Sequence, residues 1–252
     1  MQLAEYRRED QKNPGRLVEM MKKILFVLAL MCLAPLSWAA NDTAQAVTDR
    51  LQHAGEVLQQ VMATPDKGIP EEVMDHAKCV AVVPHLVKGG FVFGAEGGRG
   101  VATCRTAHGW SAPAFFSVEG GSWGLQIGVE GIDLVMIIQN DHGMQQLLGS
   151  KFQIGGDASA AAGPVGRHAS ADTDWKLNTE ILTYSRAKGI FAGLTLNGAA
   201  VHRDDDSMKS FYGPNVSTRD VLMGQVPPPP ASMAFLDAVR AAHHQAREAE
   251  NQ

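Results

Sequence analysis

The sequence lacks an excess of basic charge and contains little cysteine. Its 22 Lys and Arg residues are outnumbered by 27 Asp and Glu residues, which gives a formal net charge of −5 at pH 7. Proteins that bind nucleic acid normally carry the opposite sign, so nucleic acid is not an expected partner. Only 3 cysteines occur in 252 residues, so the chain can form at most one internal disulfide bond.

Metal-binding and repeat motifs are missing as well. Residues 204–206 are three consecutive aspartates, but no glycine and distal glutamate follow at the spacing of a calcium loop, so we expect a solvated turn there. No group of cysteines and histidines has the spacing of a zinc site. No period of about 20 to 50 residues recurs, which excludes a repeat array. We therefore expect neither a metal nor a cofactor.

The apolar run near the N-terminus is too short to span a membrane. Residues 24–36 form a run of 13 residues, whereas a spanning helix needs about 20. Lys22 and Lys23 precede the run, and small residues follow it at the positions that a signal peptidase reads. The pattern predicts a signal peptide over residues 21–39, cleaved after Ala39, and disfavours the alternative of a membrane anchor.

Export determines what we expect of the remaining chain. Residues 1–20 are polar and charged, which indicates an untranslated or mis-assigned start before a true initiation at Met20 or Met21. The mature chain, residues 40–252, holds 16 basic and 23 acidic residues, and it is long enough for one domain with a substantial core. We expect a periplasmic protein that can associate with a membrane surface.

Two cysteines remain after cleavage, Cys79 and Cys104. Both lie in strand-like segments that can be neighbours in one sheet. An exported chain meets an oxidising compartment, so an even pair predicts a disulfide bond. The alternative is two separate buried thiols.

The periodicity of apolar residues predicts one α+β domain. Residues 42–65 repeat apolar positions every three or four residues, and residues 69–79 form a second, shorter helix. From Val80 onward the pattern changes to short alternating or apolar segments with glycine-rich joints, which is typical of antiparallel strands. Residues 40–226 therefore predict a curled, barrel-like antiparallel sheet flanked by short helices.

The last part of the chain contains clear turn and helix signals. Asn197-Gly198 predicts a two-residue β-hairpin. Residues 217–224 have the caps of a short helix. Four prolines begin at Pro227 and predict a stiff spacer, so residues 227–252 are expected to form a spacer and a C-terminal helix.

A stretch of small residues, 155–170, has two interpretations. It lacks the spacing of a Walker A loop and of a dinucleotide fingerprint. Backbone N–H groups around Gly163 and Gly166 can form an anion nest with Arg167 as the countercharge. Alternatively, glycine and alanine let two backbone segments pack closely. We favour close packing, and we expect Ala161→Leu to overpack the stretch.

The segment Gly120-Gly-Ser-Trp-Gly124 matches the G-x-S-x-G motif of serine hydrolases. That motif places its serine on a sharp turn from a strand into a helix. The residues after Ser122 alternate as in a strand, so the required helix is absent. A hydrolase that uses Ser122 remains a remote alternative, and we expect no enzymatic activity.

Several blocks occur together and in order: "VAVVPHLVKGGFVFGAEGGRGVATCR", "GWSAPAFFSVEGGSWGLQIGVEGIDLVMIIQN", "GGDASAAAGPVGRHASADTD" and "YSRAKGIFAGLTLNGAAV" followed by "FYG". From about residue 69 to residue 213 the chain resembles the SYLF domain family. The resemblance implies a non-catalytic module that binds anionic phospholipids, including phosphoinositides, and that in some eukaryotic members binds actin. It also implies membrane contact by a basic N-terminal helix, although Arg50 is the only Lys or Arg in the corresponding helix here.

Cations at the edges of the glycine-rich segments are the candidate headgroup ligands. Anionic headgroups need such donors beside accessible N–H groups, and the candidates are Lys88, Arg99, Arg167, Arg186 and Lys188. The alternative for each is an ordinary turn cation in water. We expect a phospholipid or a membrane surface as the partner. The alternative function is an interaction module that uses its terminal helices to contact another protein.

Overall fold

The computed structural model describes residues 44–64, 68–90, 93–123, 128–164, 179–187, 190–193 and 198–250. These residues belong to one compact unit, Asp42–Gln252. The expected signal peptide and start, residues 1–39, lie outside the described part, so both stay predictions. Among the described helices, none is both long and apolar enough to cross a membrane.

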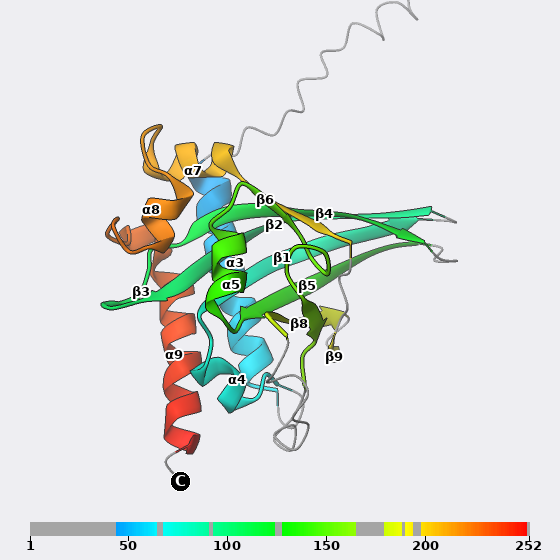
Figure 1. Ribbon diagram of the computed structural model, residues 1–252, viewed down its shortest axis with the longest axis horizontal. Coiled ribbons are helices and arrows are strands. Elements are labelled where there is room, and N and C mark those ends of the chain that lie inside the picture. Colours follow the sequence, from blue (N-terminus) through cyan, green and yellow to red (C-terminus); the bar gives the residue numbers. More distant parts are fainter. Residues whose placement is uncertain are drawn as a thin grey trace, which may run out of the picture. The chain divides into compact units, whose positions relative to one another are not determined.

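Ten strands form one curled sheet with helices packed against it, which confirms the predicted α+β class (Figure 1). The strands are β1 (Cys79–Gly90), β2 (Phe93–Thr106), β3 (Gly109–Trp110), β4 (Ala114–Trp123), β5 (Gly128–Ile138), β6 (Lys151–Gln153), β7 (Ala160–Ala162), β8 (Ile181–Ala187), β9 (Ile190–Gly193) and β10 (Ala200–Arg203). Their main order is β6-β10-β4-β2-β1-β5-β8-β7, with β3 beside β2 and β9 beside β8. Neighbours are antiparallel except β7 and β8, which are parallel, so the sheet is mixed where the sequence predicted an antiparallel one.

The connection from β6 to β7 explains why the sheet curls. These two strands follow each other in the chain but lie at opposite ends of the strand order. Eight flat strands would separate the two edges by about 34 Å, whereas the seven steps from Gln153 to Ala160 reach at most about 25 Å. The edges must therefore approach each other, and Ile154 and Ala158 form a parallel bridge within the connection.

The hairpin predicted at Asn197-Gly198 falls partly outside the described residues, because Asn197 is not among them; within the described residues, β9 and β10 do not pair with each other. Gly198 has the positive φ, 91°, that such a turn favours. The strands on either side nevertheless bind different neighbours, because β9 pairs with β8, whereas β10 pairs with β4 and β6. A local turn signal correctly indicated glycine at a left-handed position, but it did not determine which strands pair.

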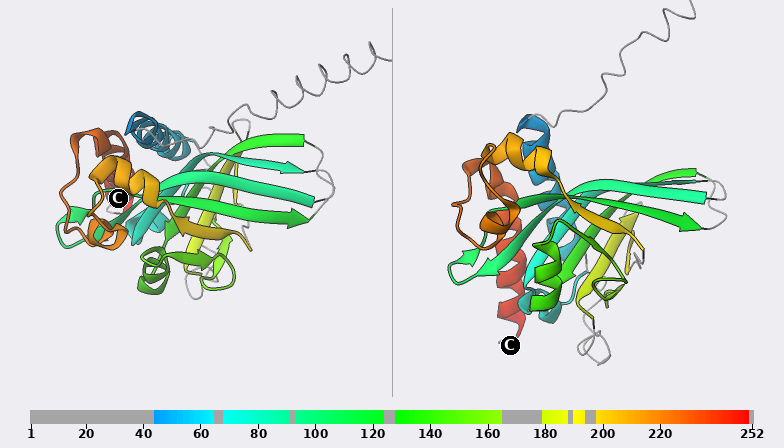
Figure 2. Two further views of the ribbon diagram at one scale, coloured as in Figure 1. Left: turned by 90° about the horizontal axis from the view of Figure 1, so that it is seen from above. Right: turned by 45° about the horizontal axis from the view of Figure 1, so that its top comes forward.

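The described helices are α3 (Ala44–Met62), α4 (Glu71–Asp75), α5 (Asp141–Leu147), α7 (Asp205–Tyr212), α8 (Thr218–Leu222) and α9 (Met233–Glu250), with a short 3₁₀ turn, η2 (Pro230–Ser232). α3 and α9 lie side by side (Figure 2). A Cβ atom on Gly55 would lie 2.7 Å from the carbonyl oxygen of Ala234, so glycine permits this close approach. Phe235 and Val239 of α9 belong to the same buried core as Leu51 of α3.

The two cysteines face each other on neighbouring strands. Cys79 of β1 and Cys104 of β2 are direct partners in the antiparallel register. Their Cα atoms lie 4.0 Å apart, and their sulfur atoms are joined in a disulfide. This position satisfies the distance that a disulfide requires, while the oxidation state of the protein in its own compartment stays a prediction.

Candidate functional site

The contacts of Arg50 show which face of the sheet is covered by α3. Its guanidinium carbon lies 5.9 Å from the centre of the Phe115 ring on β4, and one of its nitrogens lies 3.2 Å from Asp204 Oδ2. We call the face of the sheet that carries Phe115 the α3 face. Arg50 is buried and is the single Lys or Arg of α3, so the helix presents no basic side chain to a membrane.

Asp204 corrects the expectation of a solvated turn at residues 204–206. It is buried and forms the N-cap of α7, where its carboxylate accepts hydrogen bonds from the backbone N–H and the hydroxyl of Ser207. The same carboxylate binds Arg50. Asp204 thus joins the start of α7 to α3 and is a structural residue.

A line of polar side chains begins two residues after Phe115. Alternate residues of a strand share a face, so Ser117 lies on the α3 face. Ser117 is directly opposite Arg99 of β2 and His202 of β10, and His202 is directly opposite Lys151 of β6. Direct partners on neighbouring strands also share a face. These four residues therefore lie in one line across four strands.

The line continues beyond an irregularity in β1. Val87 pairs with Gly97 of β2 and with Gly131 of β5, so these three residues share the α3 face. Arg99 and Asp133 are each two residues further along their strands, and both lie on the same face. Asp133 is in turn directly opposite Arg186 of β8.

His85 occupies the bulge between Arg99 and Asp133. Its φ is 62°, a left-handed conformation that is uncommon for residues other than glycine. Its backbone N–H donates to Asp133 Oδ1 at 3.1 Å. Its ring covers Gly131, where an added Cβ would lie 2.4 Å from His85 Cε1. The bulge thus turns the imidazole onto the α3 face.

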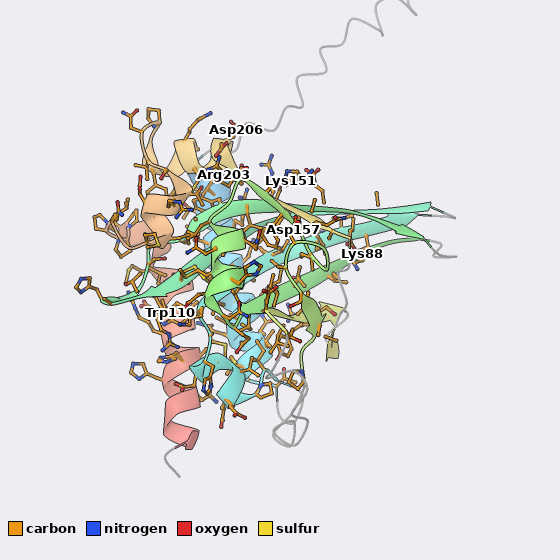
Figure 3. All side chains as sticks on the ribbon, viewed as in Figure 1. Lys88, Trp110, Lys151, Asp157, Arg203 and Asp206 are labelled. Carbon is orange, nitrogen blue, oxygen red and sulfur yellow. A yellow bond between two sulfur atoms is a disulfide. The ribbon has the colours of Figure 1, made fainter. Side chains whose placement is uncertain are left out.

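We call this line the polar row. Each member is exposed or half-buried, and Figure 3 labels Lys151 on β6. The row contains three cations, two imidazoles, one hydroxyl and one carboxylate. In strand order it consists of Lys151, His202, Ser117, Arg99, His85, Asp133 and Arg186.

Two of the five cations predicted from the sequence, Arg99 and Arg186, belong to the polar row. The Arg99 side chain is 43% exposed, and its Nε lies 3.9 Å from Asp204. Arg186 is held more closely, because its Nε donates to Asp133 Oδ2 at 2.9 Å. Arg167 and Lys188 lie outside the described residues and stay predictions.

Lys88 lies apart from the row. It follows Val87 on β1 and so points to the opposite face of the sheet. It is directly opposite Glu96 of β2, and its Nζ lies 2.8 Å from Glu96 Oε2. The Glu96 side chain is only 8% exposed. This ion pair stabilises the pairing of two strands, and the structure does not bring Lys88 together with Arg99 and Arg186.

Sequence reasoning missed five members of the row, which are Lys151, His202, Ser117, His85 and Asp133. No local sequence signal marks any of them as part of a site. Lys151, His202 and Arg99 come into one line only because β6 pairs with β10, β10 with β4, and β4 with β2, which joins segments far apart in the chain. The positive φ of His85 has no sequence signal either, since glycine or asparagine is the usual residue there.

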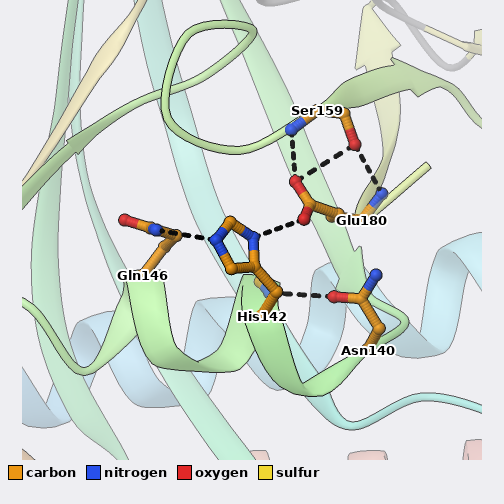
Figure 4. A network of polar contacts seen from close by, with 6 residues as sticks. Asn140, His142, Gln146, Ser159 and Glu180 are labelled. Atoms are coloured by element: carbon orange, nitrogen blue, oxygen red, sulfur yellow. Dashed lines mark hydrogen bonds and ion pairs between the residues drawn. The ribbon is translucent and has the colours of Figure 1, made fainter. Parts of the chain in front are cut away.

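A second polar cluster joins α5 to the edge of β8 (Figure 4). Glu180 accepts hydrogen bonds from the backbone N–H and the hydroxyl of Ser159, and it binds His142, which also contacts Gln146. Burial by itself raises the pKa of Glu180, but the Ser159 and His142 contacts outweigh it and lower the pKa below its usual value. The net effect favours the ionised carboxylate.

This cluster does not have the geometry of a serine hydrolase. A nucleophilic serine needs a hydrogen bond to the imidazole that will remove its proton. The Ser159 hydroxyl instead bonds the Glu180 carboxylate, and His142 lies on the other side of that carboxylate. Ser122 does not meet the requirement of the G-x-S-x-G motif either. It lies within strand β4, opposite Gly94 of β2, and not at a turn from a strand into a helix.

The small residues of the 155–170 stretch permit close packing at one position in particular. Gly163 donates its N–H to Thr183 O, and a Cβ atom there would lie 2.1 Å from the Tyr184 ring. Burial of Tyr184 also raises the pKa of its hydroxyl. Ala161, which we expected to be the constrained position, is half-buried. The packing constraint therefore lies at Gly163.

A cavity between the sheet and helices α5 and α8 is too small for a lipid chain. It is lined mostly by apolar residues together with His202, Arg203 and Thr218, and its free space is about 10 Å³. That space holds about one water molecule. Arg203 Nε and Thr218 Oγ1 are buried there without a hydrogen-bond partner in the structure. Within the described part of the chain, no group of three His, Cys, Asp or Glu residues is placed to hold a metal ion.

The described fold is a helix-covered mixed sheet that exposes charged side chains on one face. Comparison with known families identifies the family of this domain. The Ysc84 family, described as "Las17-binding protein actin regulator", matches residues 119–242. The chain belongs to this family, of which the SYLF domain is another name.

Three relatives illustrate the similarity. Rat SH3 domain-containing YSC84-like protein 1 is 34% identical over 167 residues, which is 66% of this chain and 49% of the relative. Protein YSC84 of Saccharomyces cerevisiae is 34% identical over 207 residues, or 78% of this chain and 44% of the relative. LAS seventeen-binding protein 3 of the same yeast is 34% identical over 172 residues, or 66% and 37%. The chain thus spans less than half the length of these relatives, whose names refer to binding partners and domains.

Proposed function

We propose that this protein is a non-enzymatic binding module that contacts the anionic headgroups of phospholipids, including phosphoinositide-like headgroups. The observation that carries the proposal is the polar row. It places Lys151, Arg99 and Arg186 on one exposed face with only Asp133 as a negative member. Cations on one face attract an anionic surface even when the whole chain is acidic, because the local field acts over about 10 Å at 0.1 M salt.

Binding takes place at a surface in this proposal. The cavity beside α8 has room for about one water molecule, so it cannot take up an acyl chain. The buried Arg50 removes α3 as a basic membrane helix. The exposed face of the sheet beside α3 is therefore the better candidate for membrane contact.

The alternative of an interaction module that uses the terminal helices has less support. The valine and leucine residues of α3 are buried, and Phe235, Leu236 and Val239 of α9 belong to the same core. Among the described residues, the exposed large apolar side chains are Val87 and Met223, and neither lies on these helices. The family description and one relative's name refer to Las17 binding, so binding of a protein partner by this domain is the second candidate function.

The proposal includes export to the periplasm of a bacterial envelope and a disulfide between Cys79 and Cys104. Its support is the signal-peptide pattern of residues 21–39 and the direct pairing of the two cysteines. Mass spectrometry of periplasmic protein after alkylation tests both points. We expect a chain that begins at Ala40 and has neither thiol alkylated. A chain that retains residues 21–39, or that carries two alkylated thiols, would contradict them.

Co-sedimentation with vesicles tests the binding function. We expect the protein to sediment with phosphatidylcholine vesicles that contain phosphatidylglycerol, and not with phosphatidylcholine alone. Binding should weaken between about 0.1 M and 1 M salt, because the screening length falls from about 10 Å to about 3 Å. Equal sedimentation with charged and neutral vesicles would overturn the proposal.

A further inference from the structure

We propose that the β6–β2 end of the polar row is a binding site for a phosphomonoester group on a lipid headgroup. This inference rests on the proposed function and makes it more specific. The site consists of Lys151, His202, Ser117 and Arg99, which are consecutive direct partners on four neighbouring strands. Of these four, the local sequence indicated Arg99, and the register of the strands adds the other three.

The spacing of the strands lets the four side chains converge on one group. Neighbouring strands lie about 4.8 Å apart, so the Cα atoms of Lys151 and Arg99 are about 14 Å apart with His202 and Ser117 between them. Lys and Arg have long flexible stems, and each can extend from its outer position toward the centre of the line. A group above His202 and Ser117 can then be contacted from both sides.

The donors match a phosphomonoester in number and charge. An ammonium, a guanidinium, an imidazole N–H and a hydroxyl are all hydrogen-bond donors. A phosphomonoester carries about −1.5 to −2 charges at pH 7 and offers three strong acceptor oxygens. The phosphodiester of an ordinary phospholipid carries a single negative charge and has one fewer free oxygen. Four donors with two fixed cations therefore favour the monoester.

At this end, Lys151 and His202 are the members without a carboxylate partner among the described residues, whereas Arg99 lies 3.9 Å from Asp204. The exposed Glu119 shares this face, because it is two residues after Ser117 on β4. Asp204 lies near Arg99, but its carboxylate already binds Arg50 and Ser207. The other end of the row differs, since Asp133 directly contacts Arg186. We call the β6–β2 end the open end, because it is the part of the row that can accept an anion.

Vesicle binding by the full chain tests the site. The double variant Lys151→Gln/His202→Gln is compared with the wild type on vesicles that contain either phosphatidic acid, a monoester, or phosphatidylglycerol, a diester, at matched surface charge. One basic side chain near an anionic surface contributes about fivefold to affinity. We expect a loss of more than about tenfold on phosphatidic acid and about fivefold or less on phosphatidylglycerol. Lys209→Gln, on the exposed surface of α7, is the control and should change binding less than about twofold.

Four outcomes distinguish the claims. A wild type that binds neither anionic vesicle overturns the proposed function itself. A wild type that binds, with the double variant unchanged or equally weakened on both lipids, overturns the phosphomonoester site alone. Lys151→Arg should retain most binding, because it keeps the charge. If soluble glycerol 3-phosphate binds the wild type as tightly as vesicles do and the double variant loses it, the site is correct and its lipid source is wrong.

Discussion

The two ends of the polar row contain similar side chains but differ in what neutralises them. At the β5–β8 end, Arg186 contacts Asp133 of the adjacent strand, and the same carboxylate accepts the N–H of His85. At the β6–β2 end, Lys151 and His202 have no carboxylate partner among the described residues. Arg186 therefore stabilises strand pairing, whereas Lys151 has no such partner in the described part of the chain. Position in the row does not by itself make a cation a binding residue.

The largest expected effect concerns the carboxylate that borders the open end. Asp204→Ala leaves Arg50 buried without its anion and removes the N-cap of α7. Breaking a buried pair by removing one partner costs about 3–5 kcal/mol. Urea denaturation measures this loss. Asp205→Ala, at an exposed neighbour, is the control and should cost less than about 0.5 kcal/mol. Similar stabilities of the two variants would show that Arg50 and Asp204 are not coupled.

The second prediction separates packed from exposed glycines at the β5–β8 end. Gly163→Ala would place a Cβ 2.1 Å from the buried Tyr184 ring, and overpacking of this kind costs about 1–3 kcal/mol. Gly131→Ala also produces a close contact, but with the His85 ring, which is exposed and can move. We expect it to cost less than about 1 kcal/mol. Thermal melts of both variants test the difference, and a reversed order would refute the packing account.

The third prediction converts the closed end of the row into an open one. Asp133→Asn keeps an oxygen that can accept from the His85 N–H but removes the charge that holds Arg186. The row then gains one net positive charge. One additional charge near an anionic surface corresponds to about 1 kcal/mol, or about a fivefold gain in vesicle affinity. Co-sedimentation on phosphatidylglycerol vesicles at low salt measures it. An unchanged or weaker affinity would mean that Arg186 does not face the membrane.

The smallest effect is expected for the carboxylate of Glu180, which precedes β8. Glu180→Gln loses the charge that binds His142 but keeps an oxygen that can accept the Ser159 N–H. We expect a loss of about 0.5–1.5 kcal/mol at pH 7. The folded pKa of Glu180 is lowered, so its stabilisation is present above the unfolded pKa of about 4.3 and disappears as the pH falls through the folded pKa. The stabilities of variant and wild type, measured by urea denaturation, should therefore converge as the pH falls below the folded pKa of Glu180. A constant difference across this range would contradict the assignment.

Local periodicity predicted most of the helices and strands, because each pattern depends only on which face of an element is buried. The sequence indicated α3, α4 and α9 by apolar spacing, and the change at Val80 marked the beginning of the sheet. It did not predict the parallel pairing of β7 and β8 or the separation of β9 from β10. Strand pairing depends on contacts between distant segments, and a turn signal describes only the residues within it.

The candidate site was predicted only in part for the same reason. A cation at the edge of a glycine-rich segment is a local feature, which identified Arg99 and Arg186. Alternation along β1 separates Lys88 from Val87 by face, but the exclusion of Lys88 also required the register that places Val87 on the face of Arg99. Predicting Lys151 and His202 as members of the row would have required the register of β6, β10 and β4. The burial of Asp204 required knowledge that Arg50, 154 positions away, lies beside it.

The bond between Cys79 and Cys104 has a consequence for the row that goes beyond stability. Slippage of β2 by one residue against β1 would exchange the two faces of β2. Arg99 would then leave the α3 face, and a glycine, Gly98 or Gly100, would take its place. A covalent bond between direct partners on these two strands prevents such a slip as long as it is intact. Reduction of one bond at the far end of β2 would thereby weaken the restriction that keeps the Arg99 side chain on the α3 face.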